Sequence, residues 1–248
     1  MIDTTLFEQP QALDRVQHRA LRLKADAVCY DRTAGMNALF ITAVEFSDVC
    51  REYPIVFVDA GSGPDGHREV APMAVLGLEK GENLMLGADG KWAARYTPAL
   101  LRGYPLGLAP VDAQSYTICI DAKSSALSAD VGERLFDDAG EPSALLNLRR
   151  QFVEEVEREA QRTRLFGRRL IELELLRAMR FDATLPDGQT MSIDGFMALD
   201  EERLATLPDA AVVELHKSGA MSLLHAHRVS LGMMRALVER RLARRATA

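Results

Sequence analysis

The sequence feature that most constrains the fold is a long stretch of helical periodicity from Ser143 to about Met179. Seven apolar residues recur there at i, i+3 and i+4 spacing: Leu145, Leu148, Phe152, Val156, Phe166, Leu170 and Leu173. Glutamates between 154 and 159 precede arginines between 162 and 169, an order that favours pairs one turn apart and agrees with the helix dipole. The pattern predicts one long amphipathic helix that must bury its stripe against another layer, with a kink at Gly167.

The N-terminal half has a different periodicity. Short apolar, β-rich runs predict strands at 39–44, 54–58, 73–78, 83–86 and 116–120. Between them, residues rich in Gly, Pro, Asn and Asp predict turns at 61–69, 79–83 and 87–92, because these residue types tolerate turn dihedrals. Two short helices are expected at 45–53 and 97–104, the second opened by Thr97-Pro98 and ended before Pro105.

Beyond the long helix, the segment around Pro186-Asp187-Gly188 predicts a β-hairpin. Further helices are expected at about 200–206, from Pro208 to the stop signal at Gly219, and from 220 to 243. The fold class is therefore α+β: a strand-rich N-terminal half with short helices, and a helix-rich C-terminal half with a long helix, a β-hairpin and a terminal helix pair.

Three regions follow from these patterns. Residues 1–126 form a strand-rich region, residues 127–142 a polar connection, and residues 143–248 a helical region with the hairpin. We expect the helices to pack on the N-terminal sheet as one compact unit, with any binding site where the two halves meet.

Composition narrows the function classes. The 248 residues include 36 acidic and 30 basic side chains, and a net charge of −6 disfavours binding to nucleic acid. Cys29, Cys50 and Cys119 are far apart and form no CxxC pair, which predicts reduced thiols rather than disulfides or a zinc site. The first twenty residues lack the features of a signal peptide, and no run of eighteen apolar residues predicts a membrane span, so we expect a cytoplasmic protein.

No catalytic, metal or cofactor motif is recognised. The glycine-rich segment 61–69 lacks the Lys-Ser/Thr of a phosphate-binding loop and predicts a surface turn. His216, His225 and His227 are the most metal-like set, but the spacing of His225 and His227 places them on different helix faces. His227 shares a face with leucines, which favours a packed histidine.

Four carboxylates could supply an acid–base pair: Glu45, Asp121, Asp137 and Asp138. Their positions beside turns and caps favour structural roles. Neither a GxSxG motif nor a cysteine–histidine signature is present.

A group of aromatic and arginine residues is the stronger candidate for a recognition surface, since both types are favoured at interfaces. Together with His227, the candidate ligand- or partner-binding residues are Arg51, Tyr53, Trp92, Tyr96, Arg102 and Tyr104. The alternative is core packing with solvated arginines. The C-terminal RRLARR could contact an acidic partner or lipid headgroups, although a solvated helix end is the simpler interpretation.

Several strings, taken in order along nearly the whole chain, resemble the SapC-like family of bacterial proteins. They are LFITAVEFSDVCREYPIVFV, PMAVLGLEKGENLML, YTPALLRGYPLGL, TICID, LFDDAG, LPDGQTMSIDGFMALDEERLATLPD and ELHKSGAMSLLHAHRVSLGMMRAL. The chain departs from the family pattern where that pattern has an aromatic in the place of Leu100, a second arginine in the place of Gly103, and bulky residues in the places of Ala220 and Met221.

The resemblance implies a genomic context for the protein but no catalytic mechanism. The family takes its name from a surface-layer locus, many members carry a peptide-transport label, and others are encoded beside outer-membrane nutrient receptors and flavin-dependent halogenase-like proteins. No catalytic residues carry over from it.

The first hypothesis is therefore a non-catalytic binding or accessory protein with a protein or peptide partner, linked to nutrient uptake or to an oxygenase or halogenase. The alternatives are an enzyme with an unrecognised acid–base or metal site, and a surface-layer or transport component. A homodimer is compatible with the wide apolar stripes of the helices.

Overall fold

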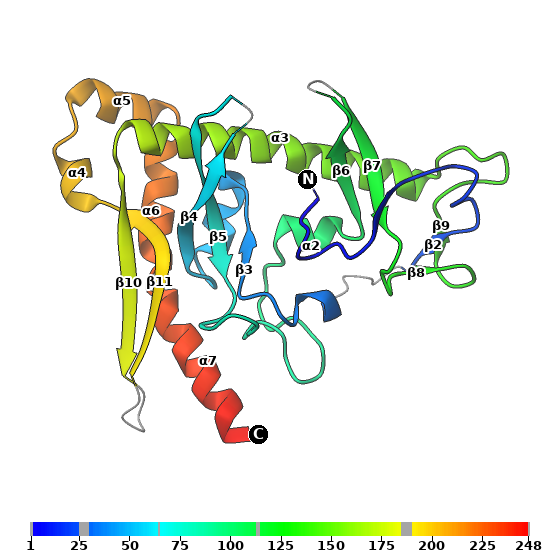
Figure 1. The fold of residues 1–248 in the computed structure, drawn as a ribbon, viewed down its shortest axis with the longest axis horizontal. Helices are drawn as coiled ribbons and strands as arrows, with labels where there is room; N and C mark the ends of the chain where they lie inside the picture. The colour runs from blue at the N-terminus through cyan, green and yellow to red at the C-terminus, as the bar shows by residue number, and fades with distance from the viewer. Residues whose placement is uncertain (1, 25–29, 64, 113–114, 185–189, 248) are drawn as a thin grey trace. The chain divides into compact units, whose positions relative to one another are not determined.

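The computed structural model describes residues 2–24, 30–63, 65–112, 115–184 and 190–247. Sheets and helices confirm the α+β class (Figure 1). The chain forms two compact units, each discontinuous in sequence: a first unit of Met1–Thr33 with Thr97–Arg158, and a second unit of Ala34–Tyr96 with Glu159–Ala248. Whether the three regions predicted from the sequence pack as a single unit stays a prediction.

The first unit contains two small antiparallel sheets. One has the order β1 (Pro10–Ala12), β7 (Tyr116–Asp121), β6 (Leu106–Pro110); the other has the order β8 (Leu127–Ser128), β2 (Arg22–Leu23), β9 (Glu133–Arg134). The short helices η1 (Asp31–Thr33) and α2 (Ala99–Gly103) complete it. Its core is apolar and includes Leu23, Leu106, Ile120, Phe136, Leu146 and Val153.

The second unit is built on a five-stranded antiparallel sheet. The strand order is β10 (Leu176–Thr184), β11 (Thr190–Leu199), β4 (Ile55–Ser62), β5 (Arg68–Val75), β3 (Ala38–Phe40). β10 pairs with β11 along its length, whereas β11 and β4 share the single pair Met197↔Phe57 within the described strands. The hairpin formed by β10 and β11 is thus joined to the rest of the sheet over a short distance.

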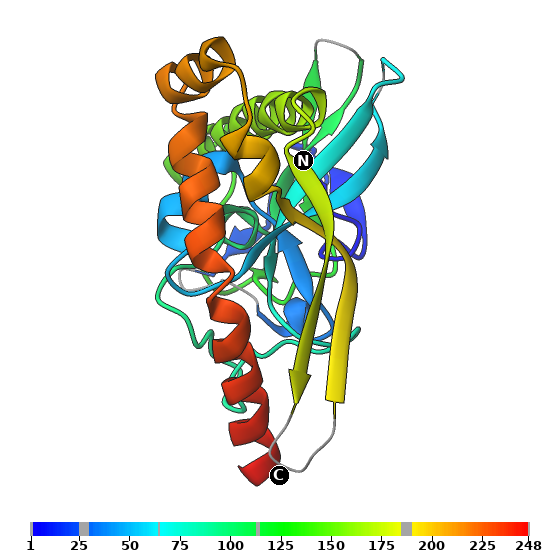
Figure 2. The same cartoon turned by 90° about the vertical axis from the view of Figure 1, so that its left-hand side faces the viewer.

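Helices of the second unit lie around this sheet: η2 (Ala43–Glu45), α1 (Phe46–Val49), α4 (Glu201–Ala205), α5 (Asp209–Lys217), α6 (Ala220–Ser230) and α7 (Met233–Thr247). Figure 2 shows α6 and α7 following one another alongside the β10–β11 hairpin. The continuous last helix expected from 220 to 243 is wrong, because the chain turns at Gly232 between α6 and α7.

The long helix α3 (Ala144–Glu172) is confirmed, and its residues from Glu159 onward belong to the second unit. It ends at Glu172 rather than near Met179. Glu174 has a left-handed φ of 54°, which ends the helix, and β10 begins two residues later. Leu148, expected in the buried stripe, is 65% exposed.

The hairpin predicted near Pro186-Asp187-Gly188 is confirmed by β10 and β11, although those three residues lie outside the described ranges. The strand expected at 83–86 is wrong. Only a single bridge, Leu86↔Trp92, forms there. Strand β6 was not predicted, because Pro105 and Gly107 are residues that usually interrupt strands.

Two arginines of the C-terminal RRLARR segment make contacts inside the second unit. Arg241 is buried and forms ion pairs with Glu79 and Glu82, and Arg244 donates to the carbonyl oxygens of Asn83 and Leu86. These contacts fasten α7 to the loop that follows β5. Within the described ranges, no helix combines the length and apolarity needed to cross a membrane.

Gly167 lies where α3 closely approaches the backbone of strand β5. α3 continues through Gly167 without interruption, and the kink at this residue stays a prediction. A Cβ at this position would lie 2.7 Å from the Val70 carbonyl oxygen on β5. Glycine is therefore required because α3 and the sheet approach each other closely here.

We expect Gly167→Ala to lower the free energy of unfolding by about 1–3 kcal/mol, because the new methyl group must push α3 away from a rigid strand. Urea denaturation followed by circular dichroism measures the change. Gly35→Ala is the matched control, since no atom lies within 4 Å of a Cβ there. Equal effects of the two substitutions would contradict the close-approach explanation.

Candidate functional site

Three of the six predicted aromatic and arginine residues form one hydrogen-bonded network in the second unit. The Trp92 indole Nε1–H donates to the Tyr53 hydroxyl at 2.7 Å, and this hydroxyl donates to the Tyr96 carbonyl oxygen. The Tyr96 hydroxyl in turn donates to Glu45 Oε1 at 2.9 Å. Tyr53 is completely buried, whereas Trp92 and Tyr96 are half-buried.

Glu45 connects this network to the start of a helix. It is buried, and its Oε2 accepts from the Thr42 backbone N–H at 2.7 Å and from the Thr42 hydroxyl at 2.8 Å, which completes a capping box. Glu52 accepts from the backbone N–H groups of Arg95 and Tyr96 at 2.9 and 2.8 Å. The network therefore holds the segment 92–96 against α1, and its carboxylates serve structure.

Arg102 and Tyr104 belong to the first unit. The Tyr104 hydroxyl donates to Asp121 Oδ2 at 2.8 Å, and the Asp121 carboxylate also accepts from the backbone N–H groups of Glu8 and Gln9 at 3.0 and 2.9 Å. Burial alone would raise the pKa of Asp121, but these donors outweigh it and hold the pKa below its ordinary value. Burial raises the pKa of the Tyr104 phenol. Asp121 is thus a fixed anion that ties down the N-terminal segment.

The exposed members of the predicted group are Arg51 and Arg102. Arg51 lies 3.7 Å from Asp48 on its own helical turn, and the Arg102 guanidinium lies 5.1 Å from the centre of the Phe152 ring. Tyr53 and Tyr104 are buried in different units. A shared binding surface of these residues stays a prediction.

His227 is buried and bridges two strands. Its Nε2 accepts from the Leu199 backbone N–H at 3.1 Å, while Nδ1 lies 2.9 Å from the Ile55 carbonyl oxygen. These partners define a neutral ring with the proton on Nδ1. Burial lowers its pKa from 6.5 to about 4, and the hydrogen bond to Ile55 offsets only part of that shift.

The remaining titratable candidates have local structural roles or are exposed. Asp137 accepts from the backbone N–H groups of Ala139 and Glu141, and Asp138 pairs with Arg134. His216 and His225 are exposed on helix surfaces. In the part of the chain that the structure describes, no three His, Cys, Asp or Glu side chains are grouped as metal ligands would be.

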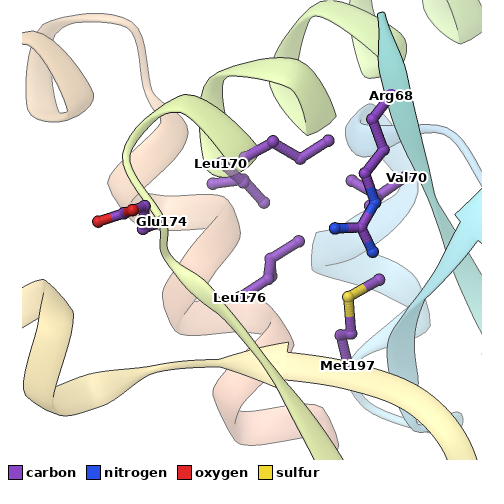
Figure 3. Close-up of a pocket in the computed structure, with 7 residues that line it drawn as sticks. Arg68, Val70, Leu170, Glu174, Leu176 and Met197 are labelled. Carbon is purple, nitrogen blue, oxygen red and sulfur yellow. The ribbon is translucent and has the colours of Figure 1, made fainter.

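A small cavity of about 180 Å³ lies in the second unit between the end of α3 and the sheet, and Figure 3 shows it. Its apolar lining includes Val70, Leu170, Leu176 and Met197, and Arg68 and Glu174 also line it. The Arg68 guanidinium extends toward Met197, and the Glu174 carboxylate points away. The cavity is smaller than the roughly 300–1,000 Å³ of most ligand sites, and Arg68 is already paired with Asp59.

A larger hollow, the helical groove, lies among η2, α3, α5 and α6 and has a volume of about 320 Å³. It is lined by Ala43, Arg162, Leu165, Phe166, Arg169, Glu214, Ser218, Ala220 and Leu223. Leu165 is 65% exposed although Phe166 beside it packs on Phe46 and Phe57, with ring centres 6.2 and 6.3 Å apart. An apolar groove with an exposed leucine is the best candidate binding site of the described residues.

Arg169 fixes one wall of the helical groove. Its Nε and Nη2 donate to the two Glu214 oxygens at 2.8 and 2.5 Å, and its Nη1 donates to Glu172 at 2.8 Å. The hydrogen bonds that Arg169 donates to Glu214 and Glu172 raise its pKa, so it is a permanent cation. This bidentate pair joins α5 to α3.

The groove is not evident from the sequence, because Leu165 and Phe166 both suit an apolar helix. Two adjacent apolar residues on a helix point about 100° apart, so one of them must leave the buried face. That geometry was the available signal.

Comparison with known proteins assigns the family. A family model described as SapC matches residues 13–237, nearly the whole chain. The chain belongs to the SapC family. Neither the curated proteins nor the solved structures contain a match to it.

His227 should make the stability of this SapC-family chain depend on pH. The unfolded chain takes up a proton near the ordinary pKa of 6.5, whereas the folded chain does so only near 4. The contribution of His227 is therefore fully present above pH 6.5 and is lost as pH falls to 4, by about 3 kcal/mol.

Urea denaturation at several pH values measures this loss. We expect His227→Gln to lose less stability than the unmodified chain between pH 6.5 and 4, because its amide does not titrate. His225→Gln, at an exposed position, should keep the full slope. Parallel slopes for the unmodified chain and His227→Gln would contradict the buried, neutral histidine.

Proposed function

We propose that this SapC-family chain is a non-catalytic binding protein that holds an apolar segment of a protein or peptide partner in the helical groove. The single observation that carries the proposal is Leu165, which is 65% exposed inside an apolar groove of about 320 Å³. An exposed leucine in a concave site gains free energy when a partner removes it from water.

The floor of the groove supports an apolar occupant. Phe166 is anchored from below by Phe46 and Phe57, and Ala43, Ala220 and Leu223 offer small or aliphatic surfaces around it. The volume is at the lower end of the range for ligand sites, enough for one or two large side chains. This arrangement suits a helix or short peptide that inserts apolar anchors between helices.

The charged rim of the groove is suited to orienting a bound partner rather than to acid–base catalysis. Arg162 pairs with Glu159, and Arg169 pairs with Glu172 and Glu214, so both guanidinium groups have fixed carboxylate partners. A permanent cation such as Arg169 cannot exchange protons near neutral pH. A rim of paired charges around an apolar centre is typical of a protein-binding site.

The family resemblance directs the search for the partner. Proteins encoded near SapC-like chains, including halogenase-like oxygenases and outer-membrane nutrient receptors, are the first candidates to test. The four carboxylates considered for an enzyme have structural partners. Glu45, Asp121 and Asp137 accept hydrogen bonds from nearby backbone N–H groups, and Asp138 forms an ion pair with Arg134. They therefore give no support to the enzyme alternative.

Site-specific photocrosslinking in native cells tests the proposal. A photoreactive residue at position 165 should capture a discrete partner protein, whereas the same residue at position 148 should not. Both positions lie on α3 and are 65% exposed, which makes position 148 a matched control.

With the captured partner purified, we expect Leu165→Glu to weaken binding by about tenfold or more and Leu148→Glu to leave it unchanged. Both substitutions should alter the free energy of unfolding by less than about 0.5 kcal/mol, because both side chains are exposed. Equal crosslinking at the two positions, or binding that survives Leu165→Glu, would refute the groove as the binding site.

A further inference from the structure

We propose that β10 is the contact strand of a symmetric dimer, in which it pairs antiparallel with β10 of a second copy of this chain. The proposal concerns a different surface from the helical groove and does not depend on it. Four features of the strand lead to this inference: its edge position, its length, its charge order and its apolar face.

β10 stands at one end of the strand order of the five-stranded sheet, so within the described part of the chain no strand pairs with its outer side. Figure 1 shows it at the margin of the second unit. The opposite edge strand, β3, has 3 residues, whereas β10 has 9. The ladder of β10 with β11 has one register shift between Met179 and Phe181, where the extra residue lies on β11. A long edge strand presents a row of backbone donors and acceptors that folded proteins normally keep short, cover or pair.

When two copies of β10 pair antiparallel, one alignment places opposite charges across from each other. Arg180 and Asp182 flank Phe181, point to the same face and are 64% and 62% exposed. If a two-fold axis passes through Phe181, each Arg180 lies opposite the Asp182 of the second copy. Two such pairs form at once by symmetry, and opposite charges directly across strands stabilise the pairing.

Neighbouring registers lack this match. An axis through Arg180 would bring the two Arg180 side chains directly opposite one another, and an axis through Asp182 would do the same for the two aspartates. Like charges directly opposite each other destabilise strand pairing. The charges therefore select the register centred on Phe181.

The other face of β10 is apolar and agrees with the same register. Met179, Phe181 and Ala183 alternate along the strand and are half-buried. Pairing centred on Phe181 places the two Phe181 rings opposite each other and each Met179 opposite an Ala183. Because aromatic and aliphatic cross-strand pairs add to strand association, both faces of β10 favour this alignment.

The dimer would join two five-stranded sheets through residues 178–184 of each copy, all of them within the described strand. Strand addition at an open edge is a general mode of protein association. The intrachain contact between Arg180 and Asp182, with Nε and Oδ1 2.8 Å apart, is solvent-exposed, so both side chains can turn to partners across the interface.

A charge-swap series measured by sedimentation velocity at micromolar concentration tests the proposal. The full unmodified chain should sediment as a dimer. Arg180→Asp alone and Asp182→Arg alone each place like charges opposite one another twice, and each should weaken the dimer by about tenfold or more. The double variant Arg180→Asp with Asp182→Arg restores both complementary pairs and should restore the dimer.

Arg177→Asp is the matched control, because it makes the same charge change on the same strand outside the paired register. It should leave the dimer intact. Circular dichroism of each variant checks that the fold is retained. An unmodified chain that is monomeric, a dimer that persists in both single variants, or a double variant that stays dissociated while folded would each overturn the proposal.

Discussion

The packing of α6 and of the β10–β11 hairpin on the rest of the second unit depends on the imidazole of His227. β11 and β4 share the pair Met197↔Phe57, and the same register would place Ile55 opposite Leu199. At that position the strands exchange no direct hydrogen bond: His227 stands between them, bonded to the Leu199 N–H and the Ile55 carbonyl oxygen. The Ile55 N–H is taken by Ser230, one helical turn further along α6, at 2.9 Å. Two side chains of α6 thus form hydrogen bonds with the backbone groups of Ile55 and Leu199 that do not bond to each other across the sheet.

This bridge positions the surfaces on which both proposals rest. It joins the β10–β11 hairpin to the sheet, and it fixes α6, which contributes Ala220 and Leu223 to the helical groove. The Phe57 ring lies 5.0 Å from the imidazole and also contacts Phe166, which forms the floor of that groove. Burial keeps His227 neutral, and a neutral ring can donate from one nitrogen and accept at the other.

Much of the fold could be predicted from the sequence, because strong local periodicity and caps determine it. The long helix, the hairpin and the helices near 201–217 follow from apolar spacing, from turn residues and from the stop signal at Gly219. The end of α3 could not be predicted, since Leu173, Leu175 and Leu176 suit a helix and a strand equally well. Tertiary pairing with β11 decides the outcome there.

The site was harder to predict, since its chemistry depends on contacts distant in sequence. His227 could be recognised as a packed histidine from its leucine-lined face, but its two strand partners lie 172 and 28 residues away. Tyr53, Trp92 and Tyr96 lie in one network, in which their hydroxyl and indole groups bond to one another and to Glu45. Leu165 and Phe166 are adjacent apolar residues of one helix, and the packing of Phe166 on Phe46 and Phe57 shows which of the two faces the core.

A neutral His227 with its proton on Nδ1 takes the place of a backbone hydrogen bond between β4 and β11. Long-range nitrogen–proton correlation NMR of the imidazole at neutral pH tests it most directly. We expect a protonated Nδ1, an unprotonated Nε2 that accepts a hydrogen bond, and slow exchange of the Leu199 amide proton. A ring protonated on Nε2 or on both nitrogens, or a Leu199 amide that exchanges as freely as a surface amide, would contradict it.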